Sequence, residues 1–160
     1  MIIGERKIFA VEFELDDNSG GLWMFGKFCY WIGGEMVGDF DNGASLRDIY
    51  LQMGPILKIK NRNINIFDFS PFEIHALIKS SVYGDNCILD NALDYVIAPP
   101  VDVFDEFKIF AFSMGDEKCI VTYQREGCDI KFISLPCSEF HGVMSNSYRE
   151  IERIYDRENG

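Results

Sequence analysis

The chain has 160 residues and a net charge of −11, with 26 acidic against 15 basic residues. Its length predicts one domain over residues 1–160 with a continuous core, and a hydrophobic content of 48% excludes a disordered chain. The acidic excess disfavours nucleic acids and anionic membranes as partners, because both are bound through Lys and Arg, and it favours a basic protein.

The first 40 residues predict a meander of three antiparallel strands. Residues 7–15 alternate, with Phe9, Val11, Phe13 and Leu15 on the core side. Residues 22–32 form an aromatic-rich strand in which Gly26 suggests a bulge. Gly33-Gly34 then suits a two-residue hairpin turn, because both positions tolerate a positive φ.

Two helices are predicted from their starts. Ser45 followed by Asp48 forms a capping box, and Pro55 should make the helix stop, kink or restart near Gly54. Ser70-Pro71-Phe72-Glu73 begins a second helix that should run to about Tyr83. Residues 85–94 allow a short helix, and residues 95–97 could equally form an extended segment before Pro99-Pro100.

The second half of the chain returns to strands and ends in a long helix. Residues 107–114 are apolar on both faces, which is typical of a central strand, and residues 119–124 and 130–135 predict two more strands. A helix should begin at Ser138. These elements predict an α+β fold, with a mostly antiparallel sheet of about six strands and helices packed on one face.

Residues 26–48, GKFCYWIGGEMVGDFDNGASLRD, carry the most distinctive pattern of the chain. The runs YWIGG, VGDFD and SLRD resemble the hallmark stretch of immunity proteins from bacterial polymorphic-toxin and contact-dependent inhibition systems, most closely the family numbered forty-two. Residues 102–112 and 130–143 add weaker similarity. The resemblance implies a single immunity-protein-like domain that blocks a cognate toxin, encoded by an adjacent gene, without a cofactor.

The chain lacks the usual residue patterns of catalysis and metal binding. His75 and His141 have no ligand spacing to the cysteines, and the GxSxG, HExxH and GxxxxGK[ST] patterns are absent. The five cysteines are odd in number and form no CxxC pair, which disfavours a disulfide framework or a zinc site. They are Cys29, Cys87, Cys119, Cys128 and Cys137.

Two other functions remain open at this point. A small hydrolase could use an acidic pair, such as Asp39 with Asp41, Asp105 with Glu106, or Asp116 with Glu117, for metal binding or acid–base chemistry. A structural subunit of a larger assembly would instead need a broad exposed apolar patch. Residues 58–62, KIKNR, are the one dense basic stretch, expected as a solvated loop or helix end rather than a phosphate contact.

An acid-only block between Lys79 and Lys108 is the candidate toxin-binding surface. Its acids alternate with aromatic and apolar residues, a composition that suits capture of a basic toxin such as a nuclease by occlusion of its active site. The candidate residues are Asp85, Asp90, Asp94, Tyr95, Asp102, Phe104, Asp105 and Glu106. The N-terminus shows no secretory signal and no apolar run is long enough for a membrane span, so a cytoplasmic location is expected.

Overall fold

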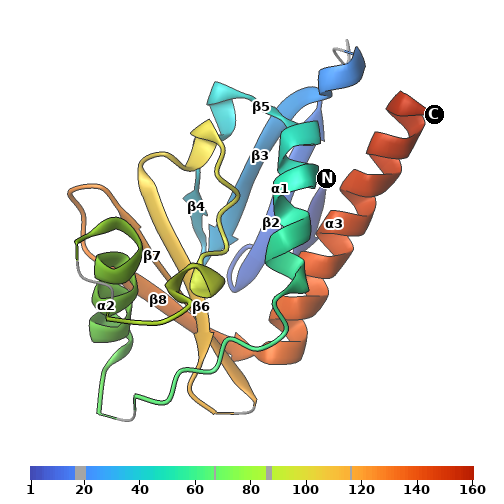
Figure 1. Cartoon of the computed structure of the whole chain (residues 1–160). Helices are drawn as coiled ribbons and strands as arrows, with labels where there is room; N and C mark the ends of the chain where they lie inside the picture. Colours follow the sequence, from blue (N-terminus) through green and yellow to red (C-terminus); the bar gives the residue numbers. More distant parts are fainter. Residues whose placement is uncertain (17–20, 67, 86–87, 116) are drawn as a thin grey trace.

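The computed structural model describes the chain except for residues 17–20, 67, 86–87 and 116. The described residues form two antiparallel sheets and three α-helices (Figure 1), which confirms the predicted α+β class. The strands are divided between two sheets rather than gathered in one. The helices are likewise divided: α1 (Leu46–Lys58) packs on the first sheet, α2 (Pro71–Tyr83) packs on the second, and α3 (Cys137–Asn159) contacts both.

The first sheet contains the predicted meander with two short additions. Its order is β1-β2-β3-β4, and β5 pairs with the beginning of β3. β2 and β3 pair without interruption from Phe9 opposite Ile32 to Leu15 opposite Gly26. Its strands are β1 (Ile2–Gly4), β2 (Phe9–Leu15), β3 (Phe25–Ile32), β4 (Glu35–Val37) and β5 (Ala44–Ser45).

Gly26 allows a close strand approach and does not form the expected bulge. It pairs in register with Leu15 on one side and with Ala44 on the other. A Cβ at this position would lie 2.0 Å from the carbonyl oxygen of Glu14. The glycine is therefore needed because the backbones of β2 and β3 meet where a side chain has no room.

The turn at Gly33-Gly34 forms as predicted. The two residues have φ values of 61° and 88°, the left-handed conformation that a side chain disfavours. Their amides donate to the carbonyls of Ile8 and Arg6, at 2.9 Å in both cases. The hairpin is thereby fastened to the loop that enters β2.

The second sheet contains the three predicted C-terminal strands, in the order β6-β7-β8. Its strands are β6 (Phe107–Ser113), β7 (Lys118–Arg125) and β8 (Lys131–Pro136). The prediction that β6 is central was wrong, because its other edge makes only isolated bridges to Asn63 and Val96. Its two apolar faces have another cause: Ile109 and Ala111 face the main core, whereas Phe110 and Phe112 face a second core under α2.

Helices α1 and α2 begin where their capping residues predict, whereas α3 begins at Cys137, one residue before the predicted Ser138, and has no side-chain cap. The Ser45 hydroxyl accepts the Asp48 amide at 3.1 Å, and Ser70 and Glu73 form a complete capping box. Helix α1 continues through Pro55, which lies on its exposed side within the last turn. None of the helices in the described part of the chain combines the length and apolar character of a membrane span.

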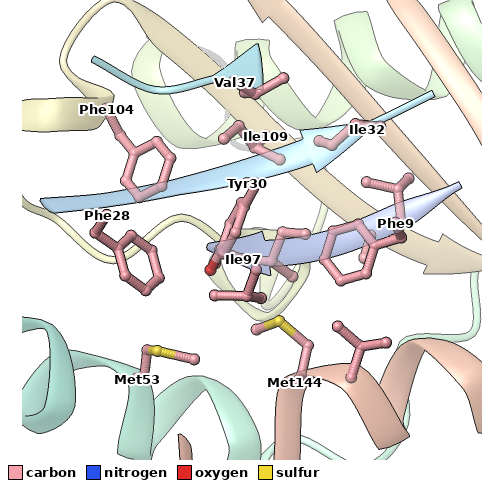
Figure 2. Close-up of a cluster of buried hydrophobic side chains, with 14 of the residues drawn as sticks. Phe9, Phe28, Tyr30, Ile32, Val37, Met53, Ile97, Phe104, Ile109 and Met144 are labelled. Carbon is pink, nitrogen blue, oxygen red and sulfur yellow. The ribbon is translucent and has the colours of Figure 1, made fainter. Parts of the chain in front are cut away.

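One large core joins the two sheets to α1 and α3. Figure 2 shows Tyr30 at its centre, with Phe9 and Phe28 from the first sheet and Met53 and Met144 from the helices around it. Ile109 and Val121 contribute from the second sheet. The smaller core under α2 contains Ile64, Ile74, Ile78, Phe110 and Phe112. The linking chain between α2 and β6 lies over the large core and contributes Ile97, Val103 and Phe104 to it.

Candidate functional site

The chain between α2 and β6 crosses the large core as a strap, defined here as residues 91–106. It contains two short 3₁₀ turns, Ala92–Tyr95 and Asp102–Phe104, joined by an extended segment. The carbonyl of Ile97 accepts a 2.7 Å hydrogen bond from the hydroxyl of Tyr30, and its amide donates to the carbonyl of Ile109 at 3.2 Å. The middle of the strap is therefore held by hydrogen bonds to the buried main chain of Ile97.

The stretch of residues 26–48 contacts the strap at Val103 and Phe104. The amide of Asp39 donates to the carbonyl of Val103 at 2.8 Å. Gly38 has a φ of 115°, and a Cβ there would lie 3.0 Å from the ring of Phe104. The Asp39 carboxylate accepts the amide of Asn42 at 3.2 Å and so caps the short turn that follows. The distinctive GD pair thus positions the strap through backbone geometry.

Arg62 anchors the beginning of the strap. Its side chain is buried, and Nε donates to the carbonyl of Asp94 at 2.8 Å. Its other guanidinium nitrogens donate to the carbonyls of Ile59 at 3.0 Å and Ile56 at 2.7 Å. The expectation of a solvated loop was wrong for Arg62, because its donors are used inside the protein to join the end of α1 to the strap.

An acidic hollow of about 640 Å³ lies between the strap, the N-terminal turn of α1 and the start of β3. Three aspartates from distant parts of the sequence line it: Asp16 after β2, Asp48 in the first turn of α1, and Asp102 in the strap. No Lys or Arg is among the described residues that line it. The hollow is therefore a concentrated negative site that suits a cationic group.

A second hollow, the apolar groove, lies on the other side of the strap. It has a volume of about 580 Å³ and runs between α1, α2 and β6. Both hollows are lined by Gln52, Pro100 and Val101, so these three residues form their common wall. The apolar residues of the groove include Ile56, Val82, Tyr83, Leu93, Val96 and Phe107. The two hollows together make a surface that is anionic on one side and apolar on the other.

Comparison with known families decides what kind of protein carries this surface. Residues 1–150 match the family described as immunity protein 42. The chain belongs to the immunity protein 42 family. This confirms the resemblance seen in residues 26–48, and it gives the function of the chain as neutralisation of a cognate toxin.

The fold of this immunity protein is also similar to a solved structure. The crystal structure of CdiI from Burkholderia dolosa AUO158 aligns with a TM-score of 0.75 and 17% sequence identity, over 94% of this chain and 99% of that chain. At this identity the likeness establishes the shared fold. Among curated proteins, none matches the chain.

The residues predicted as the toxin-binding surface of this immunity protein do not gather at one place. Asp102 lines the acidic hollow, and Phe104 and Asp105 line the apolar groove. Asp85 and Asp90 are exposed outside both hollows. Asp94 is half-buried, and its carbonyl accepts the hydrogen bond from Nε of Arg62. The hydroxyl of Tyr95 donates to the carbonyl of Asn63 at 3.2 Å. The acid-only block is thus spread along the strap and the segment before it.

Phe104 and Glu106 have structural partners. Phe104 is only 4% exposed and packs on Phe28 and Tyr30, with ring centroids 5.9 Å and 5.0 Å away (Figure 2). Its burial argues against a role as a surface anchor. The carboxylate of Glu106 accepts Nε of Arg125 at 2.9 Å in an exposed ion pair. Such pairs contribute little to stability, and this one places a cation beside the acid.

The two histidines of this immunity protein do not form a catalytic group. His75 is fully buried, and its Nδ1 lies 2.8 Å from the hydroxyl of Thr122. Burial, with a smaller contribution from Lys79, lowers the pKa of His75 to about 4. Burial and the cations Arg62 and Lys60 lower the pKa of His141. Both rings are therefore neutral at pH 7, as expected for structural histidines.

The acidic pairs proposed for a hydrolase have no shared centre. Asp39 caps a turn, and Glu106 is paired with Arg125 rather than with Asp105. Asp116, of the pair with Glu117, lies outside the described residues, and so does Cys87. Within the ranges that the structure describes, no group of three or more His, Cys, Asp or Glu side chains is arranged to hold a metal ion.

Proposed function

We propose that this protein neutralises its toxin by forming a stoichiometric complex that covers the toxin's active site or substrate groove. The observation that supports this mechanism is the acidic hollow beside an apolar groove, both facing solvent across one wall. A desolvated apolar contact with charges beside it is the usual composition of a tight protein interface. This mechanism needs neither a cofactor nor any catalysis by the immunity protein.

The proposed toxin is basic, as a nuclease is. Three aspartates line the hollow, and the whole chain carries a net charge of −11. A basic toxin would be steered toward such a surface, which speeds association and disfavours wrong partners. The contact surface retains Asp102 and Asp105 from the acid-only block and adds Asp16 and Asp48. Asp85 and Asp90 are left for longer-range steering.

The partner and setting follow from the same proposal. The toxin domain is encoded by the gene next to this one, and the two proteins meet in the cytoplasm. A surface of this charge binds neither nucleic acids nor anionic membranes, because both repel it.

Co-expression with the C-terminal domain of the neighbouring toxin tests the proposal. The two proteins should elute together from size exclusion as a stoichiometric complex, and cells with the toxin should survive only when this protein is present. Toxin recovered from the complex by denaturation and refolding should regain full activity with an unchanged mass. Separate elution, or a toxin with a changed mass, would overturn occlusion in favour of no interaction or of an enzymatic mechanism.

A further inference from the structure

The apolar groove exposes large hydrophobic side chains at its rim. Leu93 on the strap is 70% exposed and Tyr83 at the end of α2 is 51% exposed, and both line the groove. Isolated exposed apolar residues are common, but here they border a hollow that is itself apolar. A volume of about 580 Å³ lies in the range of pockets that enclose a ligand, roughly 300–1,000 Å³, so the groove has room for more than one apolar side chain.

The charges around the groove specify what kind of segment fits. Among its described lining residues, the one cation is Lys108, whose ammonium group lies 4.4 Å from the centre of the Tyr83 ring. Asp105 balances that charge on the strap. The groove is therefore close to neutral, whereas the hollow beyond Pro100 and Val101 is lined by three carboxylates. An occupant that spans the wall needs an apolar part and, beside it, a cationic part.

We infer that the toxin presents an apolar segment to this groove and, beside that segment in space, a Lys or Arg to the acidic hollow. This inference rests on the proposed function and deepens it, since it names the chemistry of the toxin surface. The two contacts have different roles. The apolar anchor in the groove is desolvated and controls dissociation, whereas the charge in the hollow acts at long range and controls association.

Truncation of Leu93 tests the anchor. Because Leu93 is exposed, Leu93→Ala should keep the fold, which a melting curve verifies. The dissociation rate of the toxin complex should rise about tenfold, as for loss of an interface anchor, while the dependence of the association rate on salt stays that of the parent. Leu93→Glu, which adds a charge at the rim, should have a larger effect.

Leu51 provides the matched control. It is a leucine on α1 that is 50% exposed and lines neither hollow. Leu51→Ala and Leu51→Glu should leave the dissociation rate within about twofold of the parent, in the range of energetically neutral surface contacts. Equal effects at Leu51 and Leu93, or parent-like dissociation for both Leu93 variants, would overturn the inference.

Two further results have separate meanings. If the parent protein does not bind the toxin, the proposed function fails before the groove is tested. If the parent alone is a dimer that Leu93→Glu converts to a monomer, the groove is occupied by a second copy and the inference is overturned.

Discussion

The hydroxyl of Tyr30 donates a 2.7 Å hydrogen bond to the carbonyl of Ile97, 67 residues further along the chain. Both residues are completely buried, and they lie together at the centre of Figure 2. Tyr30 belongs to the YWIGG run, and Ile97 to the strap that separates the two hollows. The bond therefore links the most distinctive part of the sequence to the surface proposed to bind the toxin.

Removing this hydroxyl should destabilise the protein. Tyr30→Phe leaves the buried Ile97 carbonyl without its side-chain donor, and such a loss typically costs about 1–3 kcal/mol. Urea unfolding measures the change. Tyr95→Phe is the control, because its 3.2 Å bond to the carbonyl of Asn63 is exposed and water can replace it. An equal cost for the two variants would contradict the structural role given to Tyr30.

A methyl group at Gly26 should be strongly destabilising. The added Cβ would meet the carbonyl oxygen of Glu14 at 2.0 Å, so β2 and β3 would have to separate. We expect Gly26→Ala to cost at least about 1–3 kcal/mol, as overpacking does. Gly142→Ala is the matched control on α3, where a Cβ meets nothing within 4 Å, and it should stabilise by about 0.5–1 kcal/mol. Melting temperatures that move in the same direction would refute this.

Acid should weaken the fold through His75. Its pKa is about 4 in the folded protein against 6.5 normally, because burial disfavours the charged ring. Between these values the unfolded chain takes up a proton that the folded chain does not. The stabilisation that comes from keeping His75 neutral is fully present above pH 6.5 and is lost as the pH falls toward 4. Between pH 7 and pH 5 the free energy of unfolding should fall by about 2 kcal/mol.

Denaturant unfolding at the two pH values measures this loss. The double variant His75→Phe, Thr122→Val removes the titrating ring together with the hydroxyl that lies 2.8 Å from it. From pH 7 to pH 5 its free energy of unfolding should fall by about 2 kcal/mol less than that of the parent. Thr122→Val alone keeps the histidine and should follow the parent. If the double variant retains the full pH dependence, another group is responsible.

Neutralising the acidic hollow should slow association with the toxin. The triple variant Asp16→Asn, Asp48→Asn, Asp102→Asn removes the three carboxylates that line it. The association rate at low salt should fall several-fold and its dependence on salt should flatten, since steering is screened over about 8–10 Å near physiological ionic strength. Stopped-flow mixing measures both. Asp68→Asn, Asp129→Asn, Asp156→Asn removes the same charge from exposed positions outside the hollow and should change the rate less.

Features of the fold that depend on near neighbours could be predicted from the sequence. Ser45, Ser70 and the Gly33-Gly34 turn specify their geometry within a few residues, and the structure has each of them. The division into two sheets could not be predicted. Alternate side chains of β6 are apolar on both faces, and this pattern does not distinguish a central strand from one that lies between two cores.

The candidate site was only partly predictable for the same reason. Charge density pointed to Asp102 and Asp105, which lie on the strap. Asp16 and Asp48 were missed, because only the folded chain brings the end of β2 and the start of α1 beside the strap. The acids around Phe104 in the sequence predict a surface position for it, whereas the absence of a side chain at Gly38 gives its ring space in the core.

Apart from the exposed side-chain bonds of Tyr95 and Glu106, the bonds that fix the strap use its main-chain atoms: the carbonyls of Asp94 and Val103, and both the amide and the carbonyl of Ile97. Two of these hydrogen bonds have a side-chain donor, and both donors, Arg62 and Tyr30, lie outside the strap. Exposed strap residues such as Leu93, Asp102 and Asp105 can therefore be exchanged without loosening the attachment. Under the proposed binding mode, a lineage that meets an altered toxin could change its recognition by single substitutions while the protein stays folded.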